Sequence, residues 1–256
     1  MNRPVVYAHR GASGYAVENT IPSFELAIKM KADAVEFDVQ LLSDGEVVVF
    51  HDFDLNRLFS VDRRISVLTA KELGRYTFPD AGIPMLAEVL EAIGHRIAMN
   101  IELKSQSDDP SVLRRLCKRV LELVEARGLI HDVVVSSFNR EALRQMRELS
   151  DEISMAVLVG DLSTGDAHVQ GQGRTLAFYI KTARDTRSYA INMSYTSADA
   201  RVVQDIHSAG FQVNVYTIND DDLMRTVLRK GADGFFTNYP DRAVAVVRRI
   251  PGMPTT

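Results

Sequence analysis

Strand-like and helix-like segments alternate along nearly the whole chain of 256 residues. Short apolar runs are each followed by a stretch whose apolar residues recur every three or four positions, which is typical of an amphipathic helix. The expected strands are residues 5–8, 34–40, 96–102, 133–136, 154–159, 190–192, 212–215 and 234–237. The expected helices between them are residues 23–30, 111–127, 140–149, 175–184, 198–209, 221–230 and 242–249. About eight strands, nearly all followed by helices, in a chain of about 250 residues predict a closed (β/α)8 TIM barrel of the α/β class.

A faint internal repeat supports this prediction. Residues 32–37 resemble residues 232–237, and each segment joins the end of a helix to a strand. A βα unit repeated around a ring would produce such a similarity. The alternative is an open, doubly wound sheet. Its dinucleotide-binding version is disfavoured because no Gly-x-Gly-x-x-Gly follows the first strand.

Residues 52–95 interrupt the alternation and are interpreted as a small insertion after the second strand, within a single barrel domain of residues 1–256. A turn signal at Ser43-Asp44-Gly45 leads into a short return strand at residues 47–50. A helix is expected at residues 86–93, after Pro84.

Composition excludes several classes of protein. Hydrophobic residues make up 46% of the chain and charged residues 25%, which is ordinary for a globular protein. The net charge of −4 argues against a general nucleic-acid-binding protein. Cys117 is the only cysteine, so a disulfide within the chain and a Cys-based zinc site are excluded. There is neither a secretory apolar region of about 7–15 residues nor a membrane span of about 18, so we expect a cytoplasmic location and no stable membrane anchor. The sequence carries no signal for an oligomeric state.

Carboxylates gather where the second and third expected strands end. Glu36 and Asp38 are two residues apart and share one face of a strand, as Asn100, Glu102 and Lys104 do on the next. Active sites of such barrels lie at this end of the strands. Charges that point into a barrel are costly unless they are paired or bind a metal. The all-oxygen donor set predicts a site for one divalent cation, Mg²⁺ or Ca²⁺. The alternative, a solvated face of an antiparallel sheet, is disfavoured because the intervening residues are apolar.

Four basic residues flank these carboxylates. His9 and Arg10 end the first strand, His51 ends the return strand, and Lys104 follows Glu102. Taken singly, a histidine here is more often a structural hydrogen-bonding group than a catalyst, and Arg10 and Lys104 are salt-bridge partners. Taken together, they surround the predicted cation site.

The order of these motifs resembles the glycerophosphodiester phosphodiesterase family over essentially the whole chain. The matching segments are His9-Arg10-Gly11, Glu18-Asn19-Thr20, Glu36-Phe37-Asp38-Val39, Asp44-Gly45, Val49-Phe50-His51-Asp52, Ile101-Glu102-Leu103-Lys104, Val215-Tyr216-Thr217-Ile218-Asn219, Gly231-Ala232-Asp233-Gly234 and Thr237-Asn238-Tyr239-Pro240. The sequence departs from the family at Val17, where many relatives have Pro, and at Tyr216, where many have Trp.

The resemblance implies a (β/α)8 barrel with a small insertion and a role for each conspicuous residue. His9 and His51 correspond to the catalytic histidines, whereas Glu36, Asp38 and Glu102 correspond to the metal ligands. Arg10 and Lys104 match positions that would contact the phosphate of a small-molecule substrate.

The implied reaction is metal-dependent hydrolysis of glycerophosphodiesters to glycerol 3-phosphate and an alcohol. The cation would polarise a phosphoryl oxygen, and two imidazoles with pKa values near 6.5 suit an acid–base pair. The sequence leaves open which histidine is the base. It also leaves open whether water or the glycerol 2-hydroxyl attacks, and we favour the internal hydroxyl because intramolecular attack has a high effective concentration.

Three other functions stay open at this point. The same site could serve a lysophospholipase D-like or other phosphodiesterase acting on a lipid. The protein could be a non-catalytic phosphodiester-binding module, or a barrel isomerase or aldolase in which Lys104 forms a Schiff base. Within the insertion, Phe53, Leu55, Leu58 and Phe59 either line a lid over the alcohol group or form a separate hydrophobic mini-core. The four remaining histidines, namely His95, His131, His168 and His207, are interpreted as surface residues.

Overall fold

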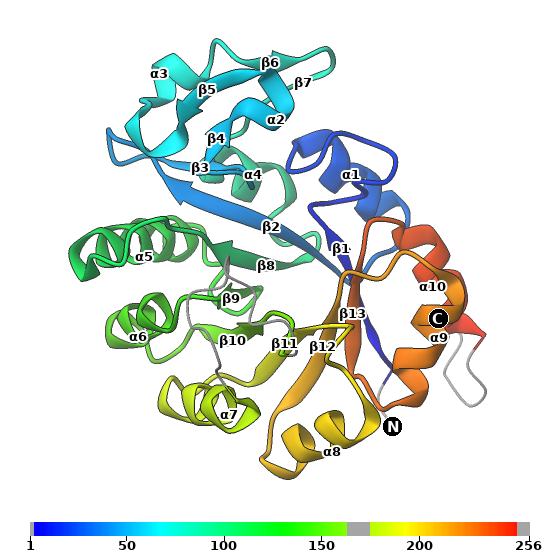
Figure 1. The fold of residues 1–256 in the computed structure, drawn as a ribbon. Helices are drawn as coiled ribbons and strands as arrows, with labels where there is room; N and C mark the ends of the chain where they lie inside the picture. The colour runs from blue at the N-terminus through cyan, green and yellow to red at the C-terminus, as the bar shows by residue number, and fades with distance from the viewer. Residues whose placement is uncertain (1–2, 163–174, 250–256) are drawn as a thin grey trace.

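The computed structural model describes residues 3–162 and 175–249 and shows a closed barrel (Figure 1). Its parallel strands are β1 (Val5–His9), β2 (Ala34–Leu41), β8 (Ala98–Leu103), β9 (Val133–Ser137), β10 (Ser154–Val159), β11 (Ala190–Ser194), β12 (Gln212–Tyr216) and β13 (Gly234–Thr237). Each strand pairs with the next along the chain, and β1 pairs with both β2 and β13. This closure confirms the predicted (β/α)8 barrel and excludes the open sheet.

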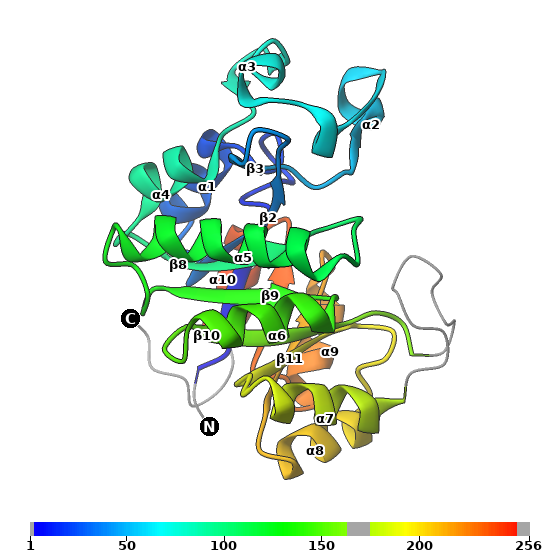
Figure 2. The same ribbon diagram turned by 90° about the vertical axis from the view of Figure 1, so that its left-hand side faces the viewer.

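Helices cover the outside of the barrel (Figures 1 and 2). They are α1 (Ile21–Lys29), α4 (Leu86–Ile93), α5 (Pro110–Glu125), α6 (Arg140–Leu149), α7 (Leu176–Asp185), α8 (Ala200–Ser208), α9 (Asp221–Arg229) and α10 (Pro240–Arg248). The strand β2 shows how its side chains divide. Phe37 lies against Phe24 of α1, with ring centroids 5.3 Å apart, so the apolar face of β2 packs under the helices. Glu36 and Asp38 therefore face the barrel interior.

The internal repeat found in the sequence corresponds to the same hydrogen bond, from a backbone N–H to an aspartate, at two places in the barrel. Asp33, just before β2, accepts a hydrogen bond of 2.8 Å from the backbone N–H of Val6 in β1. Asp233, just before β13, accepts one of 2.8 Å from the backbone N–H of Val213 in β12. Each aspartate ties the start of its own strand to the neighbouring strand.

The inserted segment follows β3 (Val47–Val49), which pairs antiparallel with β2. It contains β4 (Asp54–Leu55), α2 (Asn56–Phe59), β5 (Val61–Arg64), a 3-10 turn η1 (Ile65–Val67), α3 (Ala70–Leu73), β6 (Thr77–Phe78) and β7 (Ala81–Gly82). In Figures 1 and 2 these elements sit together above β2 and β3, on one side of the barrel.

The insertion has a hydrophobic core of its own. Leu55 is fully buried in this core, and Leu58 and Phe59 pack against it. For these three residues the structure therefore agrees with a separate hydrophobic mini-core and not with a lid that lines the substrate pocket. Phe53 differs, because it lines two surface cavities.

Helix α4 belongs to the barrel by its packing. Leu86, Val89 and Ile93 are buried in the main core together with residues of β2 and α5. The division into one domain with an insertion at residues 52–95 stays a prediction, and we propose a shorter insertion that ends before Leu86. Within residues 3–162 and 175–249, no helix is both long enough and apolar enough to span a bilayer.

Candidate active site

Three carboxylates converge at the mouth of the barrel. Glu36, Asp38 and Glu102 each offer an oxygen, and these atoms all lie within 4.8 Å of one another. The parallel register places Asp38 beside Glu102 and Glu36 beside Asn100. Glu36 and Asp38 are only 3% and 1% exposed, so their charges are removed from water.

The negative charge of this acidic cluster exceeds the positive charge of the side chains beside it. Burial, and then the charges of Asp38 and Glu102, raise the pKa of Glu36 well above its usual value. Burial also raises the pKa of Glu102 to about 7, although Lys104 opposes the rise. For Asp38 the burial is outweighed by Lys104 and Arg10, which hold its pKa below the usual range. The cluster has one more carboxylate than it has neighbouring cations, so a positive charge is required to hold all three ionised.

The chemistry of the donors fits a hard divalent cation. All three groups supply oxygen, as Mg²⁺ and Ca²⁺ prefer. Next to Glu36, the side chain of Asn100 is buried and neither of its polar atoms has a hydrogen-bond partner in the described part of the chain. A buried amide without a partner beside the carboxylates indicates a group that the protein alone does not satisfy.

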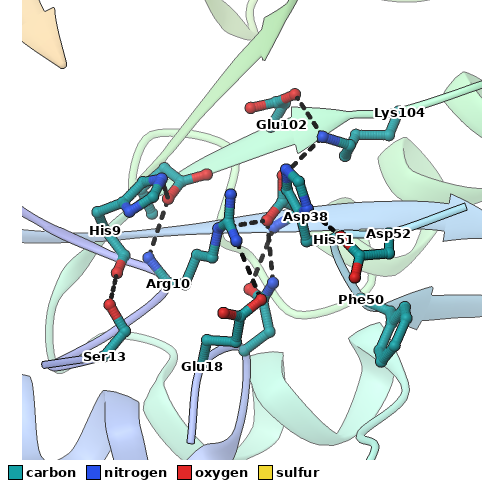
Figure 3. Close-up of polar contacts among 12 residues, drawn as sticks. His9, Arg10, Ser13, Glu18, Asp38, Phe50, His51, Asp52, Glu102 and Lys104 are labelled. Carbon is teal, nitrogen blue, oxygen red and sulfur yellow. Dashed lines mark hydrogen bonds and ion pairs between the residues drawn. The ribbon is translucent and has the colours of Figure 1, made fainter. Parts of the chain in front are cut away.

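Arg10 and Lys104 lie directly against these acids (Figure 3). Arg10 Nε is 3.4 Å from one oxygen of Asp38, and Lys104 Nζ is 3.4 Å from the other. Lys104 Nζ is also 3.5 Å from Glu102. Burial lowers the pKa of Lys104, but Glu102 and Asp38 raise it by more, so the amine stays an ammonium ion.

The turn after β1 shapes this side of the site. The backbone N–H of Arg10 donates to Glu36 at 3.0 Å, in a turn where Arg10 has φ 55° and Gly11 has φ 81°. A Cβ atom at Gly11 would lie 2.3 Å from Ser23 Oγ. Only glycine fits this close approach at a positive φ, which explains the glycine after His9-Arg10.

His9 points into the site from the end of β1. Its Nδ1 is 2.8 Å from the side-chain oxygen of Asn238, and its Nε2 is 4.0 Å from Glu36. Because a carbonyl oxygen only accepts, this contact places the ring proton on Nδ1 and leaves Nε2 as an acceptor. Burial, and then the charge of Arg10, lower the pKa of His9 to about 4, so the ring is neutral at neutral pH.

His51 is positioned by the segment that follows β3. The side chain of Gln40 donates to the carbonyl oxygens of Phe50 and Asp52, both at 2.8 Å, and so holds the backbone on either side of His51. The His51 Nδ1 atom is 2.6 Å from the Asp52 carboxylate. Burial lowers the pKa of His51, which Asp38 and Asp52 oppose.

A chain of ionic hydrogen bonds links the two sides of the mouth. Arg57, on α2 of the insertion, donates to Asp52 at 2.6 Å and to the two oxygens of Glu18 at 2.6 and 3.1 Å. Glu18 accepts a further bond of 3.0 Å from Arg10. Charge-assisted hydrogen bonds of this length are among the stronger ones in proteins. Asp52, Arg57 and Glu18 thus connect His51 to Arg10.

One cavity of about 210 Å³ brings the predicted residues together. Six of the seven line it, namely His9, Arg10, Glu36, His51, Glu102 and Lys104. Asp38 is absent from the lining but forms ion pairs with Arg10 and Lys104, which line it. The remaining wall includes Tyr216, whose hydroxyl donates to the carbonyl of Val159 at 2.6 Å.

Several neighbours were given no role from the sequence. Asn19 has φ 57° and donates to Asp38 at 2.9 Å. Asn19 and Asn238 both lie in segments that carry the family resemblance, and that resemblance was the available signal for them. Arg57 had no such signal, because its contacts depend on how the insertion folds.

The other histidines lie away from this site. His95 and His131 are exposed. His207 is partly exposed and bonds to Asp233 at 2.8 Å. His168 lies outside the described residues.

Comparisons with known proteins agree with the geometry. A family model described as the glycerophosphoryl diester phosphodiesterase family matches residues 9–242. A glycerophosphodiester phosphodiesterase of Bacillus altitudinis is 33% identical, over 94% of this chain and 97% of that protein. A human lysophospholipase D is 26% identical, over 92% of this chain and 83% of that protein.

A solved structure shows the same architecture. The phosphodiesterase of Oleispira antarctica, determined in complex with its product sn-glycerol-3-phosphate, superposes with a TM-score of 0.81 at 29% identity. The match covers 95% of this chain and 96% of that one. The chain belongs to the glycerophosphoryl diester phosphodiesterase family.

Proposed function

We propose that this protein hydrolyses glycerophosphodiesters to glycerol 3-phosphate and an alcohol, with one divalent cation, Mg²⁺ or Ca²⁺, on Glu36, Asp38 and Glu102. The observation that carries the proposal is the cluster of three carboxylates within 4.8 Å of one another, beside two cationic side chains and two imidazoles. Family membership supports the reaction. So does the Oleispira antarctica relative, whose named product is sn-glycerol-3-phosphate.

The cationic side chains would bind and orient the phosphate. When bound, the divalent ion would polarise a phosphoryl oxygen and stabilise developing negative charge. Arg10 and Lys104 line the same cavity and present donors to the remaining oxygens. Their contacts with Asp38 keep both side chains in place before substrate arrives.

The hydrogen-bond partners of the two histidines suggest how they divide the proton transfers. The Nδ1–H of His9 donates to the side-chain oxygen of Asn238, which leaves Nε2 as a proton acceptor, so we assign His9 as the general base. His51 contacts the carboxylate of Asp52, which stabilises a protonated ring, so we assign His51 as the general acid for the leaving alkoxide.

The nucleophile follows from the same arrangement. No Ser or Cys is placed beside the histidines among the described residues that line the cavity. We therefore propose that His9 removes a proton from the glycerol 2-hydroxyl, which attacks phosphorus and gives a cyclic phosphate that is then opened by water. Detection of cyclic glycerol phosphate early in the reaction is the expected result. Full turnover of a diester that lacks the 2-hydroxyl would contradict this step.

The test of the overall function uses metal-depleted protein and glycerophosphocholine. We expect no choline or glycerol 3-phosphate without metal, and restored turnover with Mg²⁺, Ca²⁺ or Mn²⁺. A variant with both His9→Ala and His51→Ala should bind metal and remain inactive. Full activity of the metal-depleted protein would overturn the proposal, and undiminished biological function of the double variant would favour a binding module.

The alternative activities make different predictions. The human lysophospholipase D relative keeps a lipid substrate as the second candidate, and faster turnover of lysophosphatidylcholine than of glycerophosphocholine would favour it. The aldolase alternative needs a neutral Lys104 amine, whereas the neighbouring carboxylates keep that group charged. Borohydride trapping should give no adduct. The cytoplasmic location stays a prediction.

A further inference from the structure

A second cavity of about 310 Å³ adjoins the active site. It lies between the inserted segment and the residues that follow β8. Its polar lining includes Arg64 and Ser66 of the insertion and Ser105 and Ser107 after β8. Lys104 lines this cavity and the active-site cavity as well, so the two cavities adjoin at this side chain.

The local fold directs Arg64 toward this cavity. Ile65 is fully buried in the core of the insertion, and its N–H donates to the carbonyl of Phe53 at 2.9 Å. Arg64 and Ser66 flank Ile65 and both line the cavity. Arg63 instead pairs with Glu72 at 3.3 Å.

One of the positive charges that line this cavity, that of Arg64, is not neutralised by an ion pair in the described part of the chain. Its lining contains two cationic side chains, Arg64 and Lys104, and no carboxylate. Lys104 is shared with Asp38 and Glu102, but no acid of residues 3–162 or 175–249 forms an ion pair with Arg64. The guanidinium of Arg64 is therefore available to an anionic ligand.

A third cavity, which Phe53 also lines, differs in charge. It has a volume of about 590 Å³, and its lining balances Asp52 and Asp54 against Arg57 and Lys104. Asp52 is already bonded to His51 and Arg57. This cavity offers a ligand no excess charge of either sign.

We propose that the 310 Å³ cavity binds the alcohol part of the diester and favours an alcohol that carries a negative charge, with Arg64 as the specificity-determining residue. This inference rests on the proposed hydrolysis of glycerophosphodiesters. The serine hydroxyls of the lining suit a small polar group. The volume is at the low end of ligand pockets, which span about 300–1,000 Å³, so an acyl chain is disfavoured.

A matched pair of substrates isolates the charge. Glycerophosphoserine differs from glycerophosphoethanolamine by one carboxylate on the leaving alcohol. We expect the parent protein to have the higher kcat/KM for glycerophosphoserine, and Arg64→Ala to reduce the ratio of the two kcat/KM values about two- to fivefold, as one ion pair of an exposed arginine allows. The loss should be in KM for glycerophosphoserine. Arg64→Lys should retain part of the preference, and Arg64→Glu should reverse it.

Arg63→Ala is the control, because it removes the neighbouring positive charge outside the cavity. It should leave the ratio unchanged. An equal loss of preference in Arg63→Ala, or an unchanged ratio in Arg64→Ala, overturns the inference while leaving the proposed function intact. If the parent protein hydrolyses neither diester with any divalent metal, the proposed function fails instead.

Discussion

Replacement of Glu36 by Gln separates the cost of the buried charge from its use in metal binding. The amide is nearly isosteric, and its oxygen can still accept the hydrogen bond from the backbone N–H of Arg10. Because burial and neighbouring carboxylates disfavour the ionised form of Glu36, the metal-free variant should be at least as stable as the parent protein. Its response to divalent ions should be nearly abolished.

The size of that response follows from binding linkage. A metal at 100 times its Kd stabilises the parent protein by about 2.7 kcal/mol, provided that it binds only the folded state. For a chain of this length about 1 kcal/mol corresponds to about 2–4 °C, so the midpoint of thermal unfolding should rise by about 5–10 °C. In Glu36→Gln we expect a rise below about 2 °C at the same concentration.

The assay is thermal unfolding in EDTA and in excess Mg²⁺, Ca²⁺ or Mn²⁺. Glu152→Gln is a matched control, because Glu152 is exposed and far along the chain from the acidic cluster. It should keep the full metal-induced rise. A rise of normal size in Glu36→Gln would refute the ligand assignment, and a large loss of stability of that variant in EDTA would refute the argument about buried charge.

Three further predictions concern the residues around the cluster. His9→Ala and His51→Ala should each lower kcat by about 10²–10⁴-fold while metal binding persists; a loss below tenfold in either would remove that histidine from acid–base catalysis. Arg57→Ala should lower kcat about tenfold and shift the basic limb of the pH profile to higher pH, because Asp52 loses the bond from Arg57 and acts more strongly on the protonated form of His51. Added guanidinium should restore part of the rate, and an unchanged profile would show that Arg57 has only a structural role. In the metal-free protein Glu102 should contribute a loss of stability between about pH 4.5 and about 7, because its pKa is raised to about 7 in the folded state and its favourable protonation is lost as pH rises. His9, whose pKa is lowered to about 4, contributes in the opposite sense, so the test compares two proteins. In denaturant titrations the stability of Glu102→Gln relative to the parent protein should increase over this range, and the same pH dependence in both proteins would contradict the prediction.

The barrel and its acidic cluster were predictable because they depend on local periodicity. The alternation of β2 separates Phe37 from Glu36 and Asp38 before any tertiary contact is known. A closed barrel then brings the ends of neighbouring strands together, so Asp38 and Glu102 had to be neighbours once the strands were identified.

Contacts made by the insertion were not predictable in the same way. Helix α4 was expected at its observed residues 86–93, but its apolar face does not reveal which of the two cores it packs against. The bonds from Arg57 to Asp52 and Glu18 join segments whose relative placement has no periodic signal. Only the tertiary structure could decide whether Phe53 and Leu55 line a cavity or pack in the core of the insertion.

Direct location of the ion tests the central claim most sharply. Crystals grown with Mn²⁺ and glycerol 3-phosphate, measured at a wavelength with strong manganese anomalous scattering, would reveal its position. We predict one peak within about 2.0–2.6 Å of an oxygen from each of Glu36, Asp38 and Glu102, with the phosphate beside it. A fully occupied peak elsewhere, or bound glycerol 3-phosphate at the barrel mouth with no metal in saturating Mn²⁺, would contradict the account.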